Sequence, residues 1–224
     1  YSKNILDSYK IGKEIKVVSN GVDLDFWKKK ENDRENFYQR YKLDKNKKSI
    51  ISVGLFIERK GILDFVDLAK KLPQYEFVWF GELKLSLVPE KIKKAVKTDL
   101  KNLHFPGYVS QELLREAYSG SDLYIFPTFE ETEGIVLLEA LATKADTIIR
   151  DIEIYKNLKD GKENYKAKDK KEFYKKIKLI LEGKYPSLKE EGYNIAQEKS
   201  IENIGLKLKK YYQDLLEREE KWEV

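Results

Sequence analysis

Four acidic side chains and a glycine surround the start of an apolar segment in residues 129–142, FEETEGIVLLEALA. An acid near a helix N-terminus is stabilised by the helix dipole by about 0.3–1 kcal/mol. One or two acids are enough for that purpose, so the others need a chemical reason. The four acids are Glu130, Glu131, Glu133 and Glu139.

A helix that begins near Gly134 offers its first amides to an anion. Those N–H groups and the helix dipole suit a diphosphate, and glycine allows the phosphates to approach closely. Glu139 lies roughly 7 Å further along the axis, at 1.5 Å per residue, where it can accept from a ribose diol. Glu131, before the first turn, would face the hydroxyls of an attached sugar. The amides concerned are those of Gly134, Ile135, Val136 and Leu137. The segment therefore predicts a nucleotide-sugar site.

Short apolar runs alternate with segments of helical periodicity along most of the chain. Near-continuous apolar runs are typical of parallel strands buried on both faces, and their alternation with helices predicts one Rossmann-like, doubly wound α/β domain. We expect the α/β core over about residues 14–183, C-terminal helices over 184–224, and helices specifically at 168–183 and 189–220. The predicted strands are 14–19, 49–54, 76–81, 102–107, 122–127 and 146–150.

Ligands of open parallel sheets bind at the carboxyl ends of the strands. Five predicted turns follow strands there, and each alone could be an ordinary strand-to-helix connection. Their occurrence at successive strand ends favours a ligand site at this edge. The turns are SNGVD, GLFIERKG, FGE, FPGYVS and PTFEETEG.

Composition excludes several classes of site. The chain has no cysteine and a single histidine, His104, so disulfides, thiolate catalysis and His-cluster or zinc–thiolate metal sites are excluded, and we expect no metal and no cofactor. The 44 basic residues exceed the 39 acidic ones by only 5, without an arginine-rich aromatic stripe, so no nucleic-acid partner is expected. We interpret His104 as a packed strand residue and Asp23-Leu24-Asp25 as a turn.

No apolar run approaches the roughly 20 residues of a membrane span. We therefore expect a cytoplasmic protein that could associate with a membrane surface. Residues 83–97, LKLSLVPEKIKKAVK, are a candidate basic amphipathic element. The alternative is an ordinary segment with one core-facing side and one solvated side.

Glu131 and Glu139 stand in the E-x7-E spacing of retaining GT-B glycosyltransferases of family four, the glycosyl transferases group 1, and other segments resemble that family in the same order. The likeness extends over about residues 5–183. The fuller string FPTFEETEGIVLLEALATK is similar to bacterial glycolipid synthases that glucosylate diacylglycerol. The further segments are VVSNGVDLDFW, VGLFIERKG and FPGYVSQELLREAYSGSDLYIFPT.

The resemblance assigns roles within a donor site for UDP-glucose or a related UDP-hexose. Glu139 would bind the ribose, Glu131 the transferred sugar as the catalytic residue, and Lys60 the diphosphate. The amides of residues 134–137 would hold the diphosphate and hexose. The backbone of Tyr108 and Val109 would meet the base. Gly81 and Glu82 would line the same cleft.

The chain departs from the family at three positions. Leu55 stands where the family usually has an arginine, and Arg59 beside Lys60 is the candidate replacement for that charge. Glu133 replaces a frequent aromatic residue, which would place a second acid near the sugar. The usual proline after Thr147 is absent, and we attach no function to that.

The resemblance predicts the C-terminal, donor-binding half of an enzyme that transfers a hexose to a lipid or saccharide acceptor. The acceptor would enter from an N-terminal domain, and the absence of methionine also indicates a fragment. We expect the fragment alone to be inactive, with its final helices packing on that domain. One alternative is a non-catalytic nucleotide-sugar binding module. A nucleotide-dependent oxidoreductase would need a Gly-x-Gly-x-x-Gly after its first strand, which is lacking.

Overall fold

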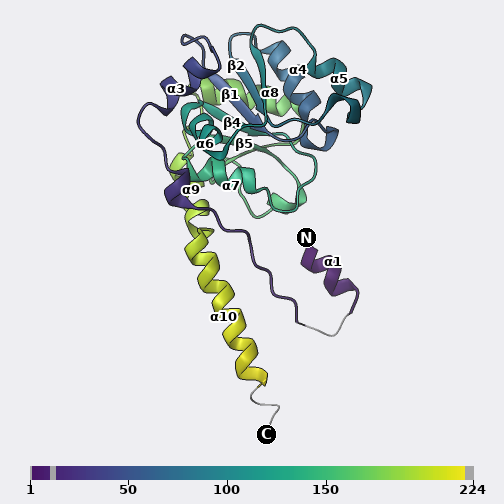
Figure 1. The fold of residues 1–224 in the computed structure, drawn as a ribbon, viewed down its shortest axis with the longest axis vertical. Coiled ribbons are helices and arrows are strands. Elements are labelled where there is room, and N and C mark those ends of the chain that lie inside the picture. The colour runs from purple at the N-terminus through teal and green to yellow at the C-terminus, as the bar shows by residue number, and fades with distance from the viewer. Residues whose placement is uncertain (1, 11–13, 220–224) are drawn as a thin grey trace.

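The computed structural model describes residues 2–10 and 14–219 and centres on a six-stranded parallel sheet. The strand order is β3-β2-β1-β4-β5-β6, so consecutive connections run one way from β1 and the other way from β4 (Figure 1). This is the Rossmann order, and its switch point lies between β1 and β4. The strands are β1 (Ser49–Val53), β2 (Glu76–Phe80), β3 (Leu103–Gly107), β4 (Leu123–Phe126), β5 (Thr147–Arg150) and β6 (Tyr165–Ala167).

Helices cover both faces of the sheet, and the strands alternate their side chains between two apolar cores. Ile50, Trp79 and Ile125 belong to the core beneath α4, α5 and α8, whereas Ile51 and Phe80 belong to the core beneath α3, α6, α7 and α9. The helices are α1 (Ser2–Ser8), α2 (Leu24–Trp27), α3 (Asp33–Arg40), α4 (Ile62–Lys71), α5 (Glu90–Val96), α6 (Gln111–Gly120), α7 (Ile135–Ala142), α8 (Lys170–Leu181), α9 (Lys189–Glu198) and α10 (Ile201–Glu219), with short 3-10 turns η1 (Glu58–Lys60), η2 (Leu85–Leu87) and η3 (Glu153–Tyr155).

The predicted fold class is confirmed, with two differences at the strand level. Residues 14–19 were predicted as a strand, and this is wrong, because they form an extended segment outside the sheet. Val17 and Val18 are exposed there, and Lys16 lies over the ring of Tyr211 on α10. The sixth strand is instead β6, which the sequence analysis missed because the short segment Tyr-Lys-Ala has no apolar run.

The predicted C-terminal helix over 189–220 is two helices, broken between α9 and α10. At the break, residues 199–201 are hydrogen-bonded to residue 22. The Val22 N–H donates to the Lys199 carbonyl at 2.9 Å, and the Ile201 N–H donates to the Val22 carbonyl at 3.1 Å. We call this meeting point, residues 21–22 with 199–201, the crossing node. A Cβ on Gly21 would lie 2.8 Å from the Cα of Ile201, so the node requires glycine.

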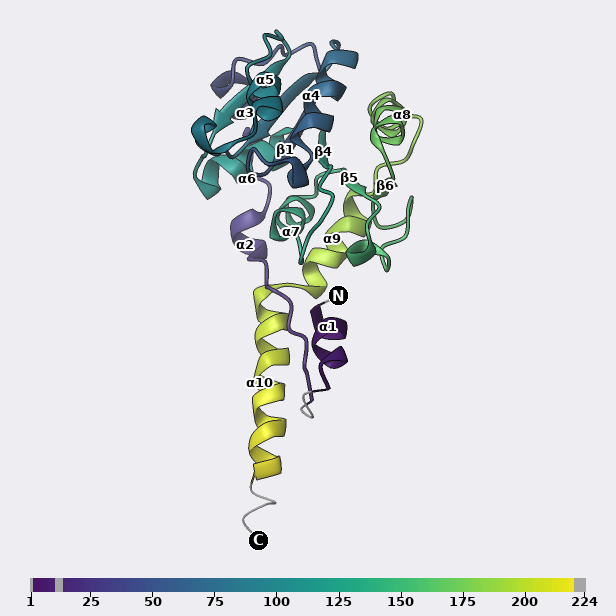
Figure 2. The ribbon, with the colours of Figure 1, turned by 90° about the vertical axis from the view of Figure 1, so that its right-hand side faces the viewer.

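Beyond the crossing node, α10 extends away from the α/β body (Figure 2). Several apolar side chains on it are exposed. Within residues 2–10 and 14–219, no helix is long and apolar enough to cross a membrane. The exposed apolar residues are Ile201, Leu206, Leu208, Tyr212, Leu215 and Leu216.

Candidate functional site

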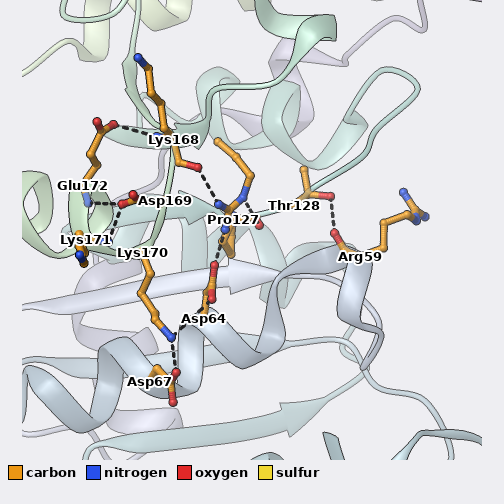
Figure 3. Close-up of polar contacts among 11 residues, drawn as sticks. Arg59, Asp64, Asp67, Pro127, Thr128, Lys168, Asp169, Lys170, Lys171 and Glu172 are labelled. Carbon is orange, nitrogen blue, oxygen red and sulfur yellow. Dashed lines mark hydrogen bonds and ion pairs between the residues drawn. The ribbon is translucent and has the colours of Figure 1, made fainter. Parts of the chain in front are cut away.

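Two loops meet at the switch point of the sheet, one after β1 and one after β4. Their main chains are joined, because the Phe129 N–H donates to the Arg59 carbonyl at 2.8 Å. The Thr128 hydroxyl donates to the same carbonyl at 3.2 Å, as Figure 3 shows, and the Arg59 guanidinium donates to the Glu130 carbonyl at 2.7 Å. The β4 loop therefore has a defined position relative to β1. We call residues 128–134 the acidic loop.

Lys60 and Glu131 form an ion pair across these two loops. The Lys60 ammonium lies 2.5 Å from Glu131 Oε2, and the two side chains are 16% and 10% exposed. The other carboxylate oxygen, Oε1, accepts from the Thr132 N–H at 3.0 Å. The sequence placed both residues in one site, and the structure brings them into contact.

The N-terminus of α7 follows the acidic loop, as predicted. Gly134 has φ +81°, and a Cβ there would lie 2.2 Å from the Tyr155 hydroxyl, so only glycine fits. The N–H groups of Ile135 and Val136 have no acceptor among the described residues. The Leu137 N–H donates to the Gly134 carbonyl at 2.9 Å. The expectation that the Leu137 amide is free is therefore wrong in this structure, because the first turn of α7 is tightened.

Glu139 lies on α7 and is buried at 8% exposure. Its Oε2 accepts from the Tyr118 hydroxyl at 3.4 Å, which is long for a hydrogen bond between two oxygens. Burial raises the pKa of Glu139 from 4.5 to about 7, against a smaller lowering by Tyr118. A buried carboxyl with so little compensation is costly, so a ligand that donates hydrogen bonds to it would be favoured.

Tyr118 was not identified from the sequence, where it reads as an apolar-face aromatic of α6. Burial raises the pKa of the Tyr118 hydroxyl well above 10, so it stays protonated and can only support Glu139 as a donor or neutral neighbour. Its ring packs edge-on against Tyr124, with centroids 5.3 Å apart. Tyr118 and Glu139 lie on different helices, so their separation in the sequence does not predict that they are in contact.

Glu133 contacts a segment far away in sequence, residues 19–20. Its carboxylate accepts from the Asn20 main-chain N–H at 2.9 and 3.1 Å, from the Asn20 side-chain amide at 2.5 Å, and from the Ser19 hydroxyl. In this structure the Glu133 carboxylate is therefore occupied by protein donors, and its expected place near a sugar stays a prediction. Three of the four acids have separate partners: Lys60 for Glu131, residues 19–20 for Glu133, and Tyr118 for Glu139.

The residues expected at the nucleobase lie on the neighbouring strand ends. The Gly81 N–H after β2 donates to the Gly107 carbonyl at the end of β3, at 2.8 Å. Tyr108 is 83% exposed, and Val109 packs against the second core. Across the described ranges, no hydrogen bond or ion pair joins this group to Glu131 or Glu139. Both groups nevertheless share the carboxyl edge of the sheet.

Arg150 is a buried organiser of the acidic loop that sequence analysis did not single out. Its guanidinium donates to the Pro127 carbonyl at 2.9 Å, to the Lys168 carbonyl at 3.1 Å and to Asp64 at 2.5 Å, and it stacks on the Phe129 ring at 3.9 Å. Figure 3 shows this network linking α4, the end of β4 and the segment before α8. A cation bonded to two main-chain carbonyls and to the Asp64 carboxylate fixes where the loop starts.

Other candidate features have structural partners. His104 lies on β3 with its Nε2 2.7 Å from Glu76, and Asp23 caps α2 by accepting from the Phe26 N–H at 2.9 Å. Within the described residues no group of three or more His, Asp or Glu could hold a metal ion. In residues 83–97, Val88 and Ile92 are buried while Leu85 and Leu87 are exposed.

A cavity of about 410 Å³ lies at the opposite, amino edge of the sheet. Basic side chains line it, and they bond to helix C-terminal carbonyls: Lys48 donates to Leu181 at 2.5 Å, and Arg34 donates to Gly120 at 3.2 Å. These cations complement the negative ends of α8 and α6. We therefore place the candidate site at the carboxyl edge, where among the described residues the Glu139 carboxyl has one long hydrogen bond and the Ile135 and Val136 amides have no acceptor.

The family described as "Glycosyl transferases group 1" matches residues 33–204. A processive diacylglycerol alpha-glucosyltransferase of Acholeplasma laidlawii is 40% identical over 96% of this chain and 66% of its own length. An alpha-galactosylglucosyldiacylglycerol synthase of Streptococcus pneumoniae is 34% identical over 72% of this chain and 44% of its own length. The chain thus spans less than two thirds of either relative.

Among solved structures, Anabaena HepE in complex with UDP-glucose superposes with a TM-score of 0.78. It is 17% identical, and the match covers 89% of this chain and 57% of the HepE chain. At this identity the likeness is one of fold.

Proposed function

Because this chain belongs to the group 1 glycosyltransferases, we propose that it is the donor-binding domain of a retaining hexosyltransferase. Its donor is UDP-glucose or a related UDP-hexose, and its acceptor is a diacylglycerol-type lipid or a saccharide. The observation that carries the proposal is Glu139, a buried carboxyl with one long hydrogen bond beside the unpaired amides of α7. Relatives named as diacylglycerol glycosyltransferases support the lipid acceptor.

In this proposal the ribose of the nucleotide lies at the Glu139 carboxylate, which accepts hydrogen bonds from the ribose diol. Hydrogen bonds to a charged acceptor are worth about 1.5–3 kcal/mol each. The base lies toward Gly81, Tyr108 and Val109 at the ends of β2 and β3. The diphosphate lies between the ribose and the hexose, over the amides of Gly134, Ile135 and Val136. Leu137 can join them only if the first turn of α7 relaxes.

In this proposal Lys60 and Glu131 pair with each other only in the ligand-free protein, and with the donor bound each contacts a different part of it. An incoming diphosphate competes for the Lys60 ammonium, which frees the Glu131 carboxylate for the hydroxyls of the transferred hexose. During transfer the bond between the anomeric carbon and the diphosphate oxygen breaks, a bond to the acceptor oxygen forms, and the acceptor's hydroxyl proton passes to the departing diphosphate oxygen. Lys60, with Arg59 beside it, stabilises the negative charge that develops on the leaving diphosphate.

The test is calorimetric titration of the chain with UDP and with UDP-glucose, alongside Glu139→Ala. We expect UDP to bind and the variant to lose about 1.5–3 kcal/mol of binding free energy, the value of a charge-assisted hydrogen bond. Glu130→Gln is the matched control, since its carboxylate is exposed and belongs to the same loop. A folded chain that binds neither ligand, or a Glu139→Ala variant with unchanged affinity, would refute the proposal.

Transfer itself requires the longer protein that the relatives' lengths indicate. We expect that protein to transfer labelled hexose from UDP-glucose to diacylglycerol, and we expect this chain alone to be inactive. Donor binding without transfer by the longer protein would support the non-catalytic module instead.

A further inference from the structure

Glu133 connects the acidic loop to a segment far away in sequence. Its carboxylate receives the Asn20 main-chain N–H, the Asn20 side-chain amide and the Ser19 hydroxyl. Backbone and side-chain donors thus converge on a single acid, and Glu133 itself is half-buried. A surface carboxylate kept only for solubility would not gather several donors from one dipeptide, so this contact has a specific geometry.

The loop side of this contact is also fixed. The Tyr155 hydroxyl donates to the Glu133 carbonyl at 3.2 Å, and Tyr155 is the same side chain that restricts residue 134 to glycine. Glu131 lies two residues before Glu133 and pairs with Lys60 at 2.5 Å. A displacement of Glu133 would therefore change the main-chain conformation of residues 131–134, which include Glu131 and the residue before α7.

The segment side is fixed at the crossing node. Directly after Asn20, Gly21 packs on Ile201, and Val22 exchanges main-chain hydrogen bonds with Lys199 and Ile201. Residues 19–22 are therefore held by the acidic loop at one end and by the start of α10 at the other. The extended segment 14–18 and α10 both leave the α/β body from this point (Figure 2).

We propose that Glu133 is a positioning residue, which ties the acidic loop to the crossing node so that Glu131 and the α7 amides keep the geometry that the hexose part of the donor requires. The proposal rests on the proposed function. Glu133 does not touch the donor itself, because its carboxylate is occupied by Ser19 and Asn20. Its effect reaches the ligand through the main chain of residues 131–134.

The experiment compares Glu133→Gln, Asn20→Ala and their combination with Glu130→Gln in the complete chain. Glutamine keeps the size of the side chain but offers one acceptor oxygen in place of two. Hydrogen exchange measures the protection of the Asn20 N–H, and calorimetry measures the affinities for UDP and for UDP-glucose. Glu130→Gln removes the same charge from the same loop without touching residues 19–20.

We expect the Glu133→Gln variant to lose protection at the Asn20 N–H and to bind UDP-glucose about five- to tenfold more weakly. This is less than the loss of a charge-assisted hydrogen bond made directly to the ligand, because Glu133 acts through the main chain. UDP affinity should fall much less, since UDP lacks the hexose. Asn20→Ala should give a similar loss, and the double variant should lose no more than either single one. Glu130→Gln should leave all of these values unchanged.

Three results would overturn the positioning role while leaving the proposed function intact: unchanged protection of Asn20, unchanged UDP-glucose affinity, or equal losses for UDP and UDP-glucose, which indicate general destabilisation. If the unsubstituted chain binds no UDP-glucose, the proposed function fails, and the positioning role fails with it.

Discussion

Acids at the two edges of the sheet have very different surroundings. At the amino edge, the half-buried Asp122 accepts from the Ser49 N–H at 2.8 Å and contacts Arg34 at 3.0 Å, and the buried Asp146 accepts from the Leu188 N–H at 2.9 Å and the Ser187 hydroxyl at 2.8 Å. At the carboxyl edge, the buried Glu139 side chain accepts one hydrogen bond from the described residues, that of the Tyr118 hydroxyl at 3.4 Å.

This difference separates acids whose partners hold the fold together from an acid that we propose to bind a ligand. A buried carboxylate that receives main-chain N–H groups stabilises the elements that supply them. A buried carboxyl left with one long hydrogen bond is costly in the ligand-free protein, and the proposed donor would supply the missing hydrogen bonds.

Replacement of a satisfied acid should cost stability and leave binding intact. Asp146→Ala should lower the free energy of unfolding by about 3 kcal/mol, because the buried Leu188 N–H loses its acceptor. Urea denaturation followed by circular dichroism measures this change. UDP affinity, measured where the variant is fully folded, should equal that of the unsubstituted chain. A selective loss of UDP affinity would contradict the division between the two edges.

Replacement of the unsatisfied acid should do the opposite. The pKa of Glu139 is raised to about 7, so its carboxyl favours the folded state below its unfolded pKa of 4.5 and loses that advantage as pH rises through about 7. Glu139→Gln, which stays neutral, should therefore stabilise the ligand-free chain by about 2 kcal/mol above neutral pH and by nothing at low pH. Urea denaturation of both proteins across this pH range measures the difference.

In the same variant UDP affinity should fall. A Glu139→Gln variant that is less stable than the unsubstituted chain above neutral pH would show that protein groups stabilise the charged carboxylate. That result would contradict the difference between the two edges.

Removal of the single donor to Glu139 should have a smaller, pH-dependent effect. The Tyr118 hydroxyl lowers the pKa of Glu139 slightly, so Tyr118→Phe should raise it further. UDP affinity should rise with pH as Glu139 ionises, and the variant should need a higher pH to reach the same affinity. Near pH 7 we expect a loss of about two- to threefold, less than a full hydrogen bond is worth. Calorimetry at several pH values measures it, and parallel losses at every pH would contradict the mechanism.

The exposed acid of the loop supplies the smallest effect. Glu130→Gln should change stability and UDP affinity by less than about 0.5 kcal/mol, as is usual for surface substitutions. Its main-chain carbonyl, which bonds to Arg59 and Thr128, is unaltered by the change. A larger loss of UDP affinity would show that net charge in the acidic loop matters more than the partners of each acid.

Local patterns were sufficient to predict most of the fold. Ser110 directly precedes a segment of helical periodicity, and it caps α6 by accepting from the Leu113 N–H, as its residue type favours. Alternating strands and helices gave the parallel sheet. The exceptions depend on contacts distant in sequence: residues 14–19 lie beside α10 instead of joining the sheet, and β6 is too short and too basic to be recognised.

The same limit applies to the candidate site. Spacing brought Glu131, Gly134 and Glu139 together, because they lie on one loop and the helix after it. It could not show that Lys60 pairs with Glu131, that Glu133 turns toward Asn20, or that Tyr118 lies beneath Glu139. These partners come from other strand ends and helices, and only the folded chain brings them within hydrogen-bond distance.

The crossing node also bears on how this domain can be combined with others. Because Val22 and Lys199 are hydrogen-bonded to each other, the α/β body between them starts and finishes at one place on its surface. A body with adjacent ends can be removed from one polypeptide and inserted into another without stretching either chain. The node therefore makes this domain a natural unit for recombination. Replacing residues 22–199 with the corresponding body of another group 1 glycosyltransferase should exchange one donor-binding domain for another.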